Sequence, residues 1–131
     1  MNKSDFILIG ARPAMGKTSF ALNLASNVSM MARKKCVFFS LEMTKEQLAE
    51  RLLASQAGVP SHKLRTGELD NDEWVRLGNA AGQFNDVELY LDDTSSITVP
   101  EIKSRVRRMK DVDVIMIDYL GLIKSATRKE N

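Results

Sequence analysis

One segment of the sequence has the residue types and spacing of a phosphate-binding loop. It runs from Ala11 to Thr18 and reads Ala-Arg-Pro-Ala-Met-Gly-Lys-Thr. This is the Walker A pattern, with Ala11 in place of the first glycine. Backbone N–H groups in such a loop, and the N-terminus of the helix that follows, donate to phosphate oxygens. A short apolar run comes before the segment and a helical pattern follows it, so the segment predicts a nucleotide site.

Three residues of this loop have distinct chemical roles. Gly16 lacks a Cβ, so the backbone can approach the phosphates closely. Lys17 brings an ammonium group to the β- and γ-phosphates, and the Thr18 hydroxyl is a hard oxygen ligand that suits Mg²⁺. The predicted nucleotide-binding residues are Ala11, Arg12, Pro13, Ala14, Met15, Gly16, Lys17, Thr18 and Ser19.

Carboxylates end two further apolar runs. Asp118 follows Val112–Ile117, which is the Walker B arrangement, and we expect it to hold Mg²⁺ largely through a coordinated water. Glu42 follows a second apolar run and is a candidate general base that would orient the attacking water. It is equally placed to complement the dipole of the helix that Thr44 caps. Position alone leaves both roles of Glu42 open.

Apolar runs alternate with helical patterns, and this alternation must position the chemical groups. It predicts an α/β fold with a mainly parallel sheet and helices on its faces. Ligands of such sheets bind beyond the carboxyl ends of the strands, where the acidic residues lie. The predicted strands are 6–9, 36–41, 87–91 and 112–117, and the predicted helices are 17–32, 45–57, 71–84 and 99–110.

Local signals refine this outline. Thr44, Asp70 and Thr98 each precede a Glu or Gln by three residues, which is the spacing of a capping box. Residues 59–69 are interpreted as a largely polar connection. Trp74 lies on an apolar stripe, which favours a core position.

Two other groups of charged residues have structural interpretations. Asp92 and Asp93 end the third predicted strand, and we interpret them as loop or capping residues. The helix 99–110 carries Lys103, Arg107 and Lys110 at helical spacing. Such a basic face attracts phosphates, but a solvated outer helix is the preferred interpretation.

Composition narrows the class of protein. The chain has 131 residues, of which 44% are hydrophobic and 27% charged, and its net charge is +2. These values fit one globular domain and neither require nor exclude nucleic acid. A disulfide framework is excluded because Cys36 is the single cysteine. We expect no membrane segment and a cytoplasmic location, since no apolar run approaches the length needed to span a bilayer.

Five short motifs in order carry a family resemblance. They are residues 11–18, Ser-Leu-Glu-Met at 40–43, Leu-Arg-Thr-Gly at 64–67, Leu-Asp-Asp-Thr at 91–94 and Ile-Asp-Tyr-Leu at 117–120. Together they resemble the RecA-like C-terminal domain of the DnaB replicative helicases, over nearly the whole chain. The resemblance implies a helicase that hydrolyses Mg-ATP, with Glu42 and Lys17 catalytic and with Thr18 and Asp118 at the metal. It also implies a homo-hexamer, single-stranded DNA in a central channel, and primase and helicase-loader partners.

The resemblance also implies that the chain is one partial RecA-like domain, residues 1–131. In RecA-like ATPases a later strand lies between the P-loop and Walker B strands, and this sequence lacks it. We therefore expect an incomplete sheet that closes by moving strands, by pairing with another copy or by swapping an element. The weaker candidates for DNA contact are Lys124, Arg128 and Lys129, which follow the Walker B segment.

Two alternative functions belong to other classes. The chain could be a non-catalytic module that binds nucleotide or associates with itself, in which case it would bind ATP without turnover. It could also be another RecA-like ATPase, of the recombinase or clock-protein kind. The Arg-Pro-x-Met loop and the Ser-Leu-Glu-Met motif argue against that second alternative.

Overall fold

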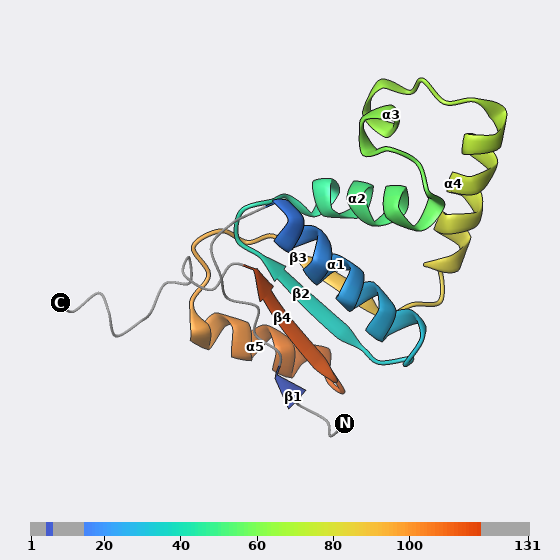
Figure 1. The fold of residues 1–131 in the computed structure, drawn as a ribbon. Helices are drawn as coiled ribbons and strands as arrows, with labels where there is room; N and C mark the ends of the chain where they lie inside the picture. The colour runs from blue at the N-terminus through green and yellow to red at the C-terminus, as the bar shows by residue number, and fades with distance from the viewer. Residues whose placement is uncertain (1–4, 7–14, 119–131) are drawn as a thin grey trace.

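The chain folds as a parallel sheet with helices on both faces (Figure 1). The computed structural model describes residues 5–6 and 15–118, with side chains from residue 21 onward. Helices and strands alternate as the sequence predicts, and the bounds of the three longer strands lie within two residues of those expected. The elements are β1 (Asp5–Phe6), α1 (Met15–Met30), β2 (Cys36–Ser40), α2 (Lys45–Ala57), α3 (Ser61–Thr66), α4 (Asn71–Gln83), β3 (Leu89–Asp92), α5 (Val99–Met109) and β4 (Val114–Asp118).

The strand order among the described residues is β1-β4-β2-β3, and every neighbouring pair is parallel. Strand β2 is central, with Cys36 opposite Val114 on one side and opposite Leu89 on the other. Strand β1 pairs directly with β4, where Phe6 lies opposite Ile115. Within the described residues, β1 and β4 are therefore direct neighbours in the sheet.

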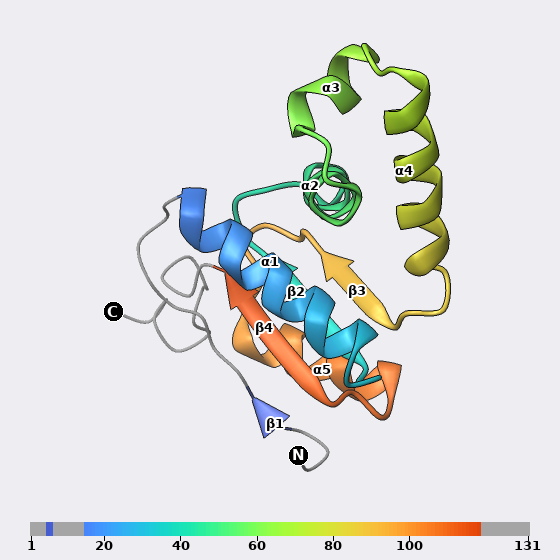
Figure 2. The same ribbon diagram turned by 45° about the vertical axis from the view of Figure 1, so that its right-hand side comes forward.

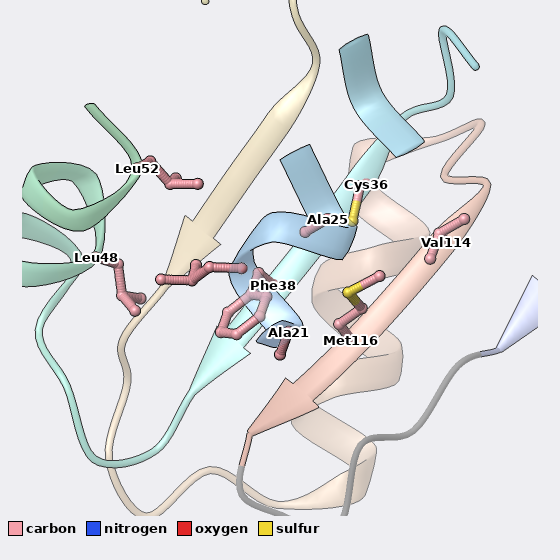
Figure 3. Packing of buried hydrophobic residues seen from close by; sticks show 9 residues of the cluster. Ala21, Ala25, Cys36, Phe38, Leu48, Leu52, Val114 and Met116 are labelled. Atoms are coloured by element: carbon pink, nitrogen blue, oxygen red, sulfur yellow. The ribbon is translucent and has the colours of Figure 1, made fainter. Parts of the chain in front are cut away.

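Alternate residues of the central strands enter two separate cores. Cys36 and Phe38 point to the side of α1 and α2, where they pack with Met116 (Figure 3). Val37 and Phe39 point to the opposite side, where α5 supplies Ile102 and β4 supplies Ile115 and Ile117. A strand that is buried on both faces needs apolar residues at every position, which explains the unbroken apolar runs.

Helix α1 approaches the sheet through small residues. Ala21, Ala25 and Ser29 recur at four-residue intervals and are all buried. Leu24 and Val28 pack beside them and are only partly buried. Helix α1 ends at Met30, two residues before the predicted end, and the Met31 side chain beyond it is 80% exposed.

All three predicted capping boxes are present. The Thr44 hydroxyl accepts from Gln47 N–H at 3.1 Å, and the Asp70 carboxylate accepts from Glu73 N–H at 2.8 Å. Thr98 caps α5 in the same way. Each box satisfies two backbone donors that have no partner inside the helix.

The interpretation of residues 59–69 as a polar connection is wrong, since they contain the short helix α3. Pro60 sits at its N-cap in an extended conformation, and Gly67 ends it with a φ of 76°. The left-handed conformation at such a position favours glycine. An ion pair of 2.9 Å between Lys63 and Glu73 joins α3 to α4.

The predicted core position of Trp74 is also wrong, because its side chain is 56% exposed. Helix α4 packs on α2 and stands outside the sheet (Figure 2). The apolar stripe of α4 therefore packs mainly against α2 and the loop residues Val59 and Leu69, and not against the sheet. Leu77 and Leu64 pack against the small core between these helices, while Trp74 lines an open groove of about 620 Å³.

The described residues contain no helix that is both long enough and apolar enough to cross a bilayer.

The exposure of Trp74 gives a direct optical test, since the chain has one tryptophan. We expect acrylamide to quench its fluorescence in the folded chain nearly as efficiently as in the urea-unfolded chain, because solvent reaches the indole in both states. Far-UV circular dichroism would confirm that the first sample is folded. Blue-shifted, poorly quenched emission would instead place Trp74 in a core.

Candidate nucleotide site

Helix α1 begins at the carboxyl edge of the sheet. Both ribbon views place its first turn beside the arrowheads of β2 and β4 (Figures 1 and 2). The first turn contains Gly16 and Lys17 and no acidic residue. The partial positive charge of a helix N-terminus is therefore not neutralised by a residue of the first turn, which suits an anionic ligand.

Three polar residues, Asp93, Ser40 and Asp118, form a row across this edge of the sheet. Ser40 at the end of β2 lies opposite Asp118 at the end of β4. Asp92 lies opposite Phe39, so Asp93 is level with Ser40 on the other side. Side chains alternate along strands, and Met116 belongs to the core on the α1 side. Asp118 continues that alternation and is directed to the α1 side of the sheet.

Asp118 is the buried carboxylate of this row. It is 7% exposed, and its backbone oxygen accepts a 2.8 Å bond from Leu41 N–H. A carboxylate at the carboxyl end of a central strand, on the side of the helix that follows a phosphate loop, is a suitable hard oxygen ligand for Mg²⁺. The arrangement therefore fits a magnesium nucleotide, with Asp118 as the described residue that would hold the metal.

Glu42 lies two residues beyond this row, in the loop between β2 and α2, and is exposed. Hydrogen bonds from two backbone N–H groups hold this loop, one on each side of Glu42. Leu41 N–H donates to Asp118 O, and Met43 N–H donates to Ser40 Oγ at 3.1 Å. The Thr44 cap then starts α2. Glu42 thus occupies a defined place beside Asp118, while its side chain faces solvent.

Asp92 and Asp93 have the loop and capping roles expected for them, on opposite faces of the sheet. Asp93 Oδ2 accepts a 2.9 Å bond from Lys45 N–H at the start of α2. Asp92 Oδ2 pairs with Arg105 Nη1 of α5 at 2.6 Å, and Asp92 Oδ1 accepts from Thr94 N–H at 3.0 Å. Burial opposes ionisation of Asp92, but these two bonds outweigh it and hold the pKa of Asp92 below its usual value.

The predicted site residues divide according to what the structure describes. Residues Ala11, Arg12, Pro13 and Ala14 and the candidate DNA contacts Lys124, Arg128 and Lys129 lie outside the described residues. Residues Met15, Gly16, Lys17, Thr18 and Ser19 form the start of α1, where the backbone alone is described.

The sequence did not predict the bond that Ser40 Oγ accepts from Met43 N–H, nor that Asp93 would accept from Lys45 N–H. The bond from Met43 N–H to Ser40 Oγ spans three residues and has the form of a local turn, so a turn signal could have found it. The bond from Lys45 to Asp93 joins residues 48 positions apart and has no local signal.

The basic face of α5 agrees with its preferred interpretation as a solvated surface. Lys103, Arg107 and Lys110 are all exposed. Arg105, on the same helix, is half-buried. Its guanidinium pairs with the Asp92 carboxylate and donates a 2.6 Å hydrogen bond to Thr94 Oγ1.

Comparison with known proteins supports the class that this geometry defines, a RecA-like ATPase domain. A solved structure of a DnaB-like replicative helicase, studied for its interactions with primase, superposes with a TM-score of 0.80 at 32% identity. The match covers 92% of this chain and 30% of that one. A second solved structure, an ATPase domain, gives a TM-score of 0.83 at 32% identity and covers 95% of this chain and 46% of that one.

The family follows from sequence. The model of the DnaB-like helicase C-terminal domain matches residues 1–131, and the chain belongs to that family. The replicative DNA helicase DnaB of Geobacillus stearothermophilus is 42% identical over an alignment of 133 positions, which covers 98% of this chain and 29% of the relative. The replicative DNA helicase DnaC of Bacillus subtilis is 40% identical over 132 residues, with the same coverage of both chains. The chain thus spans less than a third of these relatives.

The Asp92–Arg105 pair predicts a pH-dependent contribution to stability. Because the pKa of Asp92 is lowered in the folded chain, its contribution is present above the unfolded pKa and is lost as pH falls through the folded pKa. We expect Asp92→Asn to lower the free energy of unfolding by about 1 kcal/mol at neutral pH. That difference should shrink to nothing in strong acid.

Urea denaturation across a pH series would measure this effect. Asp86→Asn is the matched control, because Asp86 is an exposed aspartate without a described ion pair. A destabilisation by Asp92→Asn that stayed constant with pH would contradict the charge-based explanation.

Proposed function

We propose that this chain is the ATP-binding part of a replicative DNA helicase motor. The observation that carries the proposal is the register that places Asp118 opposite Ser40, on the side of the sheet where α1 begins after the phosphate-loop sequence. Membership of the DnaB-like helicase C-terminal domain family supports the same function. Residues 1–131 would form one partial RecA-like domain of the motor.

The phosphate loop and the start of α1 would bind the nucleotide. Backbone N–H groups of residues 11–18 and the Lys17 ammonium would hold the phosphate oxygens, with Arg12, Met15 and Ser19 beside them. Thr18 and Asp118 would hold Mg²⁺, which supplies charge stabilisation at the β- and γ-phosphates when bound. Lys17 would keep its positive charge against the γ-phosphate as negative charge develops there, which makes it the catalytic cation.

Glu42 would act as the general base. Glu42 lies on the loop that follows the central strand, one residue after Leu41, whose N–H donates to the backbone oxygen of Asp118. A carboxylate within hydrogen-bond reach of a water can orient that water and accept its proton during attack on the γ-phosphate. The exposed side chain of Glu42 is free to meet a nucleotide at this edge.

Partners of the whole motor follow from its relatives. We infer that the intact protein forms a homo-hexamer in the cytoplasm, translocates on single-stranded DNA, and works with a primase and a helicase loader. One solved DnaB-like replicative helicase was studied for its interactions with primase, which supports this assignment. Lys124, Arg128 and Lys129 remain the candidate DNA contacts. Self-association of the isolated chain is a further outcome of this proposal.

The role of Lys17 can be tested on this chain. We expect the chain to bind Mg-ATP in a calorimetric titration and Lys17→Ala to abolish the binding, because the ammonium neutralises phosphate charge. Circular dichroism should give the same spectrum for both. Lys34→Ala is a matched control, since it removes a lysine beyond the far end of α1. Unfolding of Lys17→Ala, or undiminished binding, would contradict the assignment.

The role of Glu42 can be tested by turnover in the intact protein. We expect Glu42→Gln to lower the rate of ATP hydrolysis by about 100-fold or more, because an amide cannot accept the proton from water. ATP binding should persist. Glu46→Gln is the control, since Glu46 is the second residue of α2 and is also exposed. Binding without turnover in the unmodified intact protein would favour the non-catalytic module instead.

A further inference from the structure

The Glu42 carboxylate depends on its backbone for its position. Among the described residues, no side chain donates a hydrogen bond to it or pairs with it. The loop from Leu41 to Thr44 is short, and α2 begins directly after it. Leu41 and Met43 are held by Asp118 and Ser40, so the first turn of α2 is the remaining attachment through which a shift or rotation would reach Glu42.

The first turn of α2 is anchored from a different strand. Lys45 is the first residue of α2, and its N–H is one of the donors without a partner inside the helix. It donates to Asp93 Oδ2 at 2.9 Å. The capping box of Thr44 and Gln47 satisfies other donors of the same turn but uses only residues of that turn. Ser40 Oγ holds Met43 just before the helix, and Asp93 is the described side chain that ties the first residue of α2 itself to the end of the edge strand.

Alternation along β3 explains why Asp93 can make this contact. Leu89 and Leu91 pack into the core on the α1 and α2 side. Asp93 follows at the same two-residue spacing and so faces the same side, where it reaches Lys45. Asp92 faces the other side and pairs with Arg105. The two adjacent carboxylates therefore have separate functions, and Asp93 alone is bonded to the Glu42 side.

We propose that Asp93 is a positioning residue for Glu42, which fixes the start of α2 relative to β2 and β4 so that the Glu42 carboxylate meets the attacking water. The proposal rests on the general-base role proposed above for Glu42. A base must lie within hydrogen-bond reach of the proton that it accepts, and small displacements of such a group have large effects on rate. Asp93 would not touch the nucleotide, so its influence falls on turnover and not on ATP affinity.

The test compares Asp93→Ala with Asp93→Asn in the intact protein. Alanine removes the acceptor of Lys45 N–H, whereas the asparagine side-chain oxygen can still accept that bond. We expect Asp93→Ala to lower kcat for ATP hydrolysis by about 10- to 100-fold with little change in KM. Asp93→Asn should retain most of the activity.

A further variant separates positioning from stability. Asp70→Ala removes a comparable carboxylate cap, on α4, far along the chain from Glu42. We expect it to lower the melting temperature at least as much as Asp93→Ala and to leave kcat unchanged. Equal losses of kcat in Asp70→Ala and Asp93→Ala would overturn the proposal, because general destabilisation would then explain both.

The double variant Asp93→Ala/Glu42→Gln shows whether Asp93 acts through Glu42. We expect it to be no slower than Glu42→Gln alone, since a positioning residue has no effect once its target is removed. An additional loss in the double variant would overturn the proposal. So would full activity of Asp93→Ala beside a slow Glu42→Gln, and that result would leave the general base intact. Full activity of Glu42→Gln would reject both the general base and its positioning residue.

Discussion

The hydrogen-bonded register between β2 and β4 determines the arrangement of the carboxyl edge. It sets Ser40 opposite Asp118 and brings the loop that carries Glu42 against the backbone of Asp118. A slip of one residue would reverse every side chain of the shifted strand. Asp118 would then face the α5 side, and Ile117 would enter the core under α1. The two buried cores oppose such a slip, so hydrophobic packing far from the site fixes its geometry.

Two adjacent carboxylates connect the helical layers to this edge. Asp92 bonds to Arg105 in α5 on one face, and Asp93 bonds to the first residue of α2 on the other. Asp92 ends β3 and Asp93 follows it, and among the described strands β3 pairs with β2 alone. The edge strand therefore supplies the contacts that hold helices on both faces relative to the central strand.

Much of this fold was predictable because its signals are local. The apolar runs and the three capping boxes each depend on residues close together in sequence, and the structure contains both. The exposure of Trp74 was not predictable in the same way. Its apolar stripe is real, but the helix packs on α2 and not on the sheet, and no pattern within α4 shows which neighbour it has.

The candidate site shows the same difference between local signals and contacts that depend on the tertiary fold. Asp118 and Glu42 could be predicted as candidates because a carboxylate that ends an apolar run is visible in sequence. The bond from Asp93 to Lys45 was not, since it depends on which strands become neighbours. Helix α3 was missed because its six residues are too few for an apolar stripe, although Pro60 and Gly67 mark its ends.

The central strand has a consequence for synthesis of the chain. Both neighbours with which β2 pairs in register, β3 and β4, are made after it, and β4 is separated from it by residues 41–113. While the ribosome is still adding α5, one edge of Cys36–Ser40 has no strand beside it, so its backbone N–H and C=O groups are unpaired while its side chains are largely apolar. Such an unpaired edge is a template for pairing with other chains. Emergence of Val114–Asp118 would therefore be the event that ends this exposure, and the same event completes the carboxyl edge of the sheet.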